Sequence, residues 1–135
     1  MNLTTLLLVI LCSYLVGSIS GGIIIGKLKN TDIRNLGSKS AGGTNALRTM
    51  GFLSALIVVL IDIYKGYFAA HYIPGFFFTN NLDNINQIKI FASFASILGH
   101  VYPVFFKFKG GKGVGTSVGC LLAMFPVSYA LISFS

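Results

Sequence analysis

A glycine-rich segment, "GSKSAGGTNALR", carries the densest set of polar groups in the chain and runs from Gly37 to Arg48. It holds three glycines, two serines, a threonine and an asparagine, and it ends on an arginine. Backbone N–H groups at glycines, together with hydroxyl groups, form a nest for an anion. Arg48 would add a bidentate clamp on a phosphate. The alternative is a flexible linker with solvated charges, and composition alone leaves both interpretations open.

A second segment, "KGGKGVGTS", has the glycines and lysines of a phosphate-binding P-loop but not their spacing. A P-loop requires a lysine immediately before its Ser or Thr. Here Gly115 directly precedes Thr116, and no strand is expected ahead of the segment. We therefore expect no nucleotide site. A helix that begins near Thr116 would still attract phosphate through its N-terminus.

Three ionisable residues lie inside apolar runs. Asp62 and Lys65, in "LIDIYKGY", are three residues apart and can meet on one face of a helix. His100, in "LGHVYPVFF", lies about two turns from the end of its run. An ionisable residue inside a membrane is a candidate for function. The alternatives are a self-neutralising structural pair for Asp62 and Lys65, and a hydrogen-bonded helix contact for His100.

The composition indicates a membrane protein with cationic loops. The chain has 135 residues, of which 54% are hydrophobic and 10% charged, and its net charge is +7. A soluble domain has about 25% charged residues. A nucleic-acid-binding domain is basic but far more polar, so no nucleic-acid partner is expected. Cys12 and Cys120 have no His or Cys at ligand spacing, so no metal site is expected either.

Four segments are long and apolar enough to be membrane spans, because a helix needs about 20 mostly apolar residues to cross the hydrocarbon core. The expected spans are Leu3 to Ile25, Phe52 to Ile73, Ile88 to Phe106, and Thr116 to the C-terminus. The sequence thus predicts an all-α, polytopic transmembrane helical bundle.

The charges of the connecting loops predict the orientation of the bundle. The loop from Gly26 to Met50 contains five Lys or Arg residues, and the loop from Lys107 to Gly115 contains three. The intervening loop, Pro74 to Gln87, has Asp83 as its one charged residue. The positive-inside rule places both basic loops in the cytoplasm and the N-terminus outside. The two loops would then share one face of the membrane and form one site.

Three motifs in this order closely resemble the signature regions of the bacterial acyl-phosphate:glycerol-3-phosphate acyltransferase family, also called PlsY. The first is "GSKSAGGTN", which follows "VGSIS"; the second is "DIYKG"; the third and most specific is "GHVYPVFFKFKGGKGVGT", from Gly99 to Thr116. The resemblance covers essentially the whole chain. Departures from the family pattern occur at Ser20, Lys39, Ser40, Gly43 and Gly115.

The resemblance implies an integral enzyme of the bacterial cytoplasmic (inner) membrane. Such enzymes transfer a fatty acyl group from acyl phosphate to the 1-hydroxyl of glycerol 3-phosphate and so form lysophosphatidic acid, the first acylated intermediate of phospholipid biosynthesis. No cofactor is expected. The implied partners are the two substrates, the lipid bilayer, and a separate soluble phosphate acyltransferase that supplies the acyl phosphate.

The motifs and the resemblance together assign roles to individual residues. Ser38, Arg48 and His100 are the expected catalytic residues. His100 would be the general base for the glycerol hydroxyl; in the competing route the departing phosphate oxygen takes that proton. The residues expected to bind substrate are Gly37, Thr44, Asn45, Asp62, Lys65, Lys109, Gly110, Gly111, Lys112 and Thr116.

Residues 1–135 are expected to form a single integral-membrane acyltransferase domain. The resemblance implies a family fold with about seven spans, of which about four are present here, so the domain is expected to be truncated at its C-terminus and inactive alone. The alternative function is a membrane transporter or binding protein for organic phosphates, because cationic loops at helix N-termini suit that task equally well.

Overall fold

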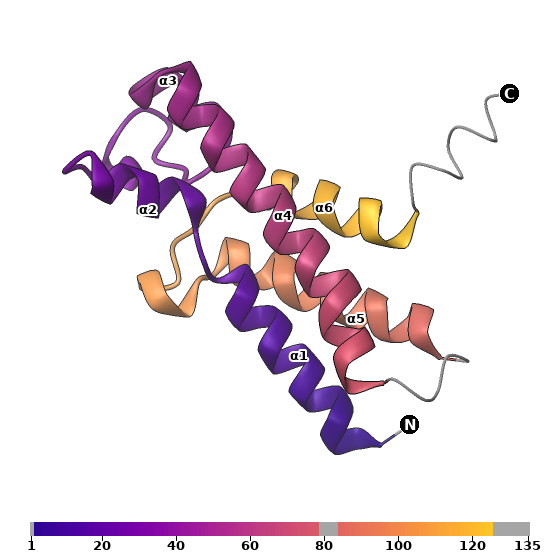
Figure 1. Cartoon of the computed structure of the whole chain (residues 1–135). Coiled ribbons are helices and arrows are strands. Elements are labelled where there is room, and N and C mark those ends of the chain that lie inside the picture. Colours follow the sequence, from indigo (N-terminus) through magenta and orange to yellow (C-terminus); the bar gives the residue numbers. More distant parts are fainter. Residues whose placement is uncertain (1, 79–83, 126–135) are drawn as a thin grey trace, which may run out of the picture.

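All regular secondary structure in the described residues is helical, as the sequence predicts (Figure 1). The computed structural model describes residues 2–78 and 84–125. The α-helices are α1 (Leu3–Gly17), α2 (Gly21–Leu28), α3 (Gly43–Met50), α4 (Phe52–Phe77), α5 (Ile85–Val101) and α6 (Val114–Met124), and the short 3₁₀ helices are η1 (Ile33–Asn35) and η2 (Val104–Phe106).

Three apolar helical segments are long enough to cross a membrane: Leu3–Leu28, Phe52–Phe77 and Ile85–Phe106. They correspond to the first three predicted spans. The fourth predicted span begins as α6, and its residues 126–135 lie outside the described residues. The predicted loop from Pro74 to Gln87 is shorter than expected, because α4 continues to Phe77 and α5 begins at Ile85. Asp83 of this loop also lies outside the described residues.

The first span is not one continuous helix, which differs from the prediction. It breaks between Gly17 and Gly21, where Ser20 begins α2 as an N-cap and its Oγ accepts a hydrogen bond from the Ile23 N–H at 3.3 Å. Serine is a favoured N-cap because its hydroxyl satisfies one of the amide groups left over at a helix start. The break places the backbone of Ile19 between two helices, where its carbonyl oxygen accepts a hydrogen bond from the Lys65 side chain.

Helix α4 is the central element of the bundle and contacts α1, α3, α5 and α6. It crosses α6 at Gly66 and Gly119. A Cβ atom on Gly66 would overlap the carbonyl of Thr116, and one on Gly119 would overlap the carbonyl of Ile63. Two membrane helices gain van der Waals contact when small residues let their backbones approach. This crossing fixes the start of α6 against the middle of α4.

Helices α2 and α3 gather with the segment before α6 at one end of the bundle, while the beginning of α1 lies at the opposite end (Figure 1). The two basic loops therefore share one end, as the sequence predicts. This end has its own small apolar core, which anchors α2, η1 and α3 on α4. Its fully or nearly fully buried members are Ile23, Ile33, Ala41, Ala46, Ala55 and Val58.

Candidate functional site

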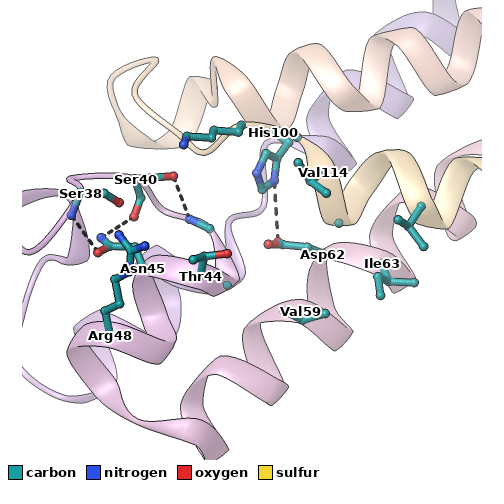
Figure 2. A pocket seen from close by; sticks show the side chains of 16 residues that line it. Ser38, Ser40, Thr44, Asn45, Arg48, Val59, Asp62, Ile63, His100 and Val114 are labelled. Carbon is teal, nitrogen blue, oxygen red and sulfur yellow. Dashed lines mark hydrogen bonds and ion pairs between the residues drawn. The ribbon is translucent and has the colours of Figure 1, made fainter.

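A cavity of about 310 Å³ lies where α3, the middle of α4, the end of α5 and the start of α6 meet (Figure 2). Its polar wall comes from the two basic loops, and its apolar wall comes from α4 and α6. The lining residues are Ser38, Ser40, Gly42, Gly43, Thr44, Asn45, Arg48, Val59, Asp62, Ile63, His100, Lys112, Gly113, Val114, Gly115 and Val118.

Seven of the thirteen residues predicted for the site line this cavity. They are Ser38, Thr44, Asn45, Arg48, Asp62, His100 and Lys112. The other six lie beside or behind it and are Gly37, Lys65, Lys109, Gly110, Gly111 and Thr116. Residues more than 60 positions apart, such as Arg48 and Lys112, thus reach the same space.

Asn45 holds the first loop in shape through its side-chain amide. Its Oδ1 accepts a hydrogen bond from the Ser38 N–H at 3.0 Å, and its Nδ2 donates to the carbonyl oxygens of Ile33, Leu36 and Ser40 at 3.2, 2.9 and 2.8 Å. Asn45 itself is 1% exposed. Because its amide is committed to the backbone, Asn45 positions Ser38 at the cavity and is not placed to hold phosphate, which differs from the expectation.

Thr44 and Arg48 lie four residues apart on α3, so both project from one face of this helix toward the cavity (Figure 2). Both are solvent-exposed. Arg48 makes no side-chain hydrogen bond or ion pair within residues 2–78 and 84–125, and the same is true of Lys112. The N–H groups in the first turn of α3 have no partner within the helix, and no side chain of the described residues caps them, so they add donors to the same rim. These groups can meet an anion from two sides.

The glycines of the second loop lie directly on His100. The N–H groups of Gly110 and Gly111 donate to the carbonyl oxygens of Val101 and His100, at 3.1 and 3.3 Å. A Cβ atom on Gly110 would overlap the His100 carbonyl, and one on Gly111 would lie 2.5 Å from His100 Nε2. These two amides are therefore used to tie the loop to α5, whereas the sequence predicted that they would bind phosphate.

Arg34 joins the two loops, a role that the motifs do not reveal. Its Nη1 donates to the carbonyl oxygens of Phe106 and Lys109 at 2.6 and 3.2 Å, while its Nε and Nη2 donate to the Asp32 carboxylate at 3.0 and 2.9 Å. The hydrogen bonds from Arg34 lower the pKa of Asp32 below its ordinary value. The Asp-Ile-Arg spacing is the one sequence signal that could have suggested this clamp.

Asp62, Lys65 and His100 form a buried polar cluster at the floor of the cavity, with 2, 4 and 2% exposure. The Lys65 Nζ lies 3.2 Å from Asp62 Oδ1, as predicted from their spacing, and 2.8 Å from His100 Nδ1. His100 Nδ1 lies 3.7 Å from Asp62 Oδ1, and Figure 2 shows the two side chains facing each other. Because Lys65 lies behind both of them, it does not line the cavity.

Thr116 lies below the cavity and not in its wall. It is fully buried, its backbone packs on Gly66, and its Oγ1 has no hydrogen-bond partner among the described residues. Helix α6 begins earlier than expected, at Val114, with Gly113 as N-cap at φ 83°. Glycine adopts this left-handed conformation without the steric cost that a Cβ atom would bring. The turn at Gly113 brings Lys112 to the rim.

The arrangement suits an anionic ligand that also has an apolar part. Arg48 and Lys112 supply positive charge at the rim, and hydroxyl groups of the first loop line the same cavity. Val59 and Val114 belong to the apolar wall. Among the residues that the structure describes, no group of three His, Cys, Asp or Glu side chains could hold a metal ion. The protein groups at the cavity that could take part in chemistry are cations, hydroxyls, the imidazole of His100 and the carboxylate of Asp62.

Comparisons with known proteins agree with this description. The family model described as glycerol-3-phosphate acyltransferase matches residues 7–135. The glycerol-3-phosphate acyltransferase of Chlorobium limicola is 46% identical over 134 residues, which cover 95% of this chain and 57% of the relative. That of Chlorobaculum tepidum is 47% identical over 134 residues, which cover 95% of this chain and 58% of the relative. The chain thus spans somewhat more than half the length of these curated relatives.

Two crystal structures have the same fold. Both are of PlsY (YgiH), an integral membrane glycerol 3-phosphate acyltransferase. The glycerol 3-phosphate form is 42% identical, with a TM-score of 0.79, and the match covers 96% of this chain and 62% of that chain. The lysophosphatidic acid form is 40% identical, with a TM-score of 0.76, and the match covers 96% of this chain and 61% of that chain. The helical arrangement is therefore that of an integral membrane protein.

Proposed function

The chain belongs to the glycerol-3-phosphate acyltransferase family, and we propose that its cavity serves the transfer of a fatty acyl group from acyl phosphate to the 1-hydroxyl of glycerol 3-phosphate. The product would be lysophosphatidic acid. Both substrates carry phosphate, and one carries an acyl chain. Residues 1–135 would belong to one acyltransferase domain, because α4 contacts every other long helix.

The observation that carries this proposal is the convergence of Arg48 and Lys112, from two different loops, on a cavity with an apolar wall. An acyl phosphate is already activated, so the protein needs no covalent nucleophile. It must orient the two substrates and stabilise negative charge as the phosphate departs. Two cations without a partner among the described residues, together with the exposed hydroxyls of Ser38 and Thr44, can do both.

The roles divide between residues that touch substrate and residues that hold them. Ser38, Thr44, Arg48 and Lys112 would contact phosphate or the reacting carbonyl. His100 would contact a substrate oxygen from the floor. The residues that would support this set without touching substrate are Gly37, Asn45, Asp62, Lys65, Lys109, Gly110, Gly111 and Thr116.

We place the protein in the bacterial cytoplasmic membrane, with the cavity end in the cytoplasm and the N-terminus outside. The support for this orientation is the excess of Lys and Arg in the two loops at the cavity end. A soluble phosphate acyltransferase on that side would then deliver acyl phosphate to the correct face. The alternative of a transporter for organic phosphates is not favoured, because the relatives and the solved structures are acyltransferases.

The test is formation of lysophosphatidic acid from acyl phosphate and labelled glycerol 3-phosphate in liposomes, by a protein that contains residues 1–135 and is extended downstream to the length of its relatives. Binding of glycerol 3-phosphate is measured in parallel, so that affinity and turnover are separated. Arg48→Gln and Lys112→Gln each remove one cavity cation. Lys39→Gly is the matched control, since Lys39 is exposed, lies outside the cavity lining and already has a φ of 63°, which glycine adopts easily.

We expect Arg48→Gln and Lys112→Gln to lower kcat/KM by about 100-fold, the order found when one donor to a developing anion is removed. Lys39→Gly should be nearly neutral. Equal losses in all three variants would mean that net loop charge, and not the cavity, supports the reaction. Accumulation of unmodified glycerol 3-phosphate inside the liposomes, without lysophosphatidic acid, would replace this proposal by transport.

A further inference from the structure

The ammonium group of Lys65 has two hydrogen-bond partners and one ion-pair partner. Its Nζ lies 2.7 Å from the carbonyl oxygen of Ile19, 2.8 Å from His100 Nδ1 and 3.2 Å from Asp62 Oδ1. An ammonium group has three N–H donors and no acceptor. A carbonyl and a carboxylate oxygen can only accept. Because the ammonium itself cannot accept, His100 Nδ1 must accept the hydrogen bond from Lys65 with its lone pair.

This contact determines where the proton of His100 resides. A neutral imidazole has one N–H and one bare nitrogen, and the bond made by one nitrogen decides the state of the other. Since Nδ1 accepts from Lys65, the proton is on Nε2. A doubly protonated ring would set an N–H of His100 against an N–H of Lys65 at 2.8 Å.

The Nε2 side of the ring faces the place where the two loops meet. The point where a Gly111 Cβ would lie is 2.5 Å from His100 Nε2 and 3.3 Å from the backbone nitrogen of Gly42. Gly42 and His100 both line the cavity. The Nε2–H group is therefore presented on the cavity side, while Nδ1 is turned toward Lys65.

We propose that Lys65 is a positioning residue that holds His100 as the Nε2–H tautomer, so that His100 presents a hydrogen-bond donor to an anionic oxygen of the substrate. The oxygen belongs to the reacting carbonyl or to a phosphate; this part rests on the proposed function. His100 then has no basic nitrogen on the cavity side, so it does not act as the general base. The donor stabilises negative charge that develops in the transition state.

The break between α1 and α2 also helps to hold Lys65 in this position. Inside a continuous helix the Ile19 carbonyl would be paired with an amide one turn later. In the break it accepts from Lys65. Asp62 balances the charge of the ammonium. Lys65 is thereby saturated by protein groups, which removes it from the residues that bind substrate phosphate directly.

The experiment is ¹⁵N NMR of histidine-labelled protein in nanodiscs at neutral pH, without substrate. The chain has two histidines, so His71→Gln leaves His100 as the one labelled ring; His71 is exposed and lies outside the cavity lining. Imidazole ¹⁵N shifts distinguish a protonated from a bare nitrogen. We expect Nδ1 to be bare and Nε2 protonated. A protonated Nδ1, alone or together with Nε2, overturns the proposal.

The second measurement adds Lys65→Met, which keeps most of the side-chain volume but cannot donate. We expect the Nδ1–H tautomer to appear, since Nδ1 could then donate to Asp62. Lys89→Met, on the same helix as His100, is the matched control and should leave the spectrum unchanged. An unchanged tautomer in folded Lys65→Met refutes the role of Lys65.

The parent spectrum alone decides the matter if Lys65→Met does not fold. Because no substrate is present, the outcome is independent of turnover. The expected tautomer in a protein that makes no lysophosphatidic acid would leave the Lys65 contact standing and would count against the proposed function only.

Discussion

Replacing Gly111 by alanine should disable the site while leaving the bundle folded. The new Cβ would lie 2.5 Å from His100 Nε2, whereas ordinary van der Waals contacts of a Cβ begin at 3.4 Å. The loop or the ring must therefore move by about 0.9 Å, the difference between these two distances. The ring is not free to retreat, because Lys65 holds Nδ1 at 2.8 Å. A misplacement of about 1 Å can cost on the order of a hundredfold in rate.

We therefore expect Gly111→Ala to lower kcat/KM for lysophosphatidic acid formation by about 100-fold. Far-ultraviolet circular dichroism should stay that of the parent, since Gly111 lies outside the helices. The matched control is Gly75→Ala, where no atom of residues 2–78 and 84–125 lies within 4 Å of the added Cβ. Its activity should equal that of the parent. Parent-like activity in Gly111→Ala, or an equal loss in Gly75→Ala, would refute the steric reasoning.

Three further predictions concern Arg48, His100 and the clamp between Asp32 and Arg34. Arg48→Ala should lower turnover far more than Lys39→Gly, because Arg48 lines the cavity and Lys39 does not; steady-state kinetics of the two variants measure this. His100→Gln, which keeps a donor but no base, should retain more activity than His100→Leu. The Asp32–Arg34 clamp, in which the pKa of Asp32 is lowered, stabilises the fold above the ordinary carboxyl value of 3.8 and is lost as the pH falls through the lowered pKa. The melting temperature of the parent should therefore decrease as the pH falls below about 4. At every pH, Asp32→Asn lacks the stability that the clamp contributes.

The sequence predicts the parts of the fold that depend on composition over long windows. Apolar length predicts the spans, and loop charge predicts that the two basic loops share one end. The Asp62–Lys65 pair follows from helical spacing alone, because both partners lie on one helix. Each of these features is local or additive along the chain, so no knowledge of the tertiary fold is needed to find it.

The break between α1 and α2 could not be predicted in the same way. The run from Leu3 to Ile25 has no proline and no charge, so hydropathy treats it as one helix. What stabilises the break is a partner 46 residues away, the Lys65 side chain, which satisfies the carbonyl of Ile19. A backbone carbonyl inside a membrane protein must find a partner within the protein. The sequence alone does not reveal Lys65 as this partner, because it reaches the Ile19 carbonyl only when α1, α4 and α5 are packed together.

The role of each polar residue in the site depends on how deeply its side chain is buried, and the residue type alone does not reveal this. Asn45 and Lys65 were expected to hold substrate, yet both are at most 4% exposed and their donors are used by protein groups. Burying such groups without partners costs several kcal/mol, so the fold must satisfy them before any ligand arrives. Arg48 and Lys112 are exposed at the rim, where water can satisfy them until an anion replaces it. Burial depth thus separates the groups that give the site its shape from the groups that give it affinity. Substitutions at the two depths should be distinguishable. Variants at the rim should change substrate binding and rate in a folded protein, whereas variants at the floor should act through the position or protonation of His100.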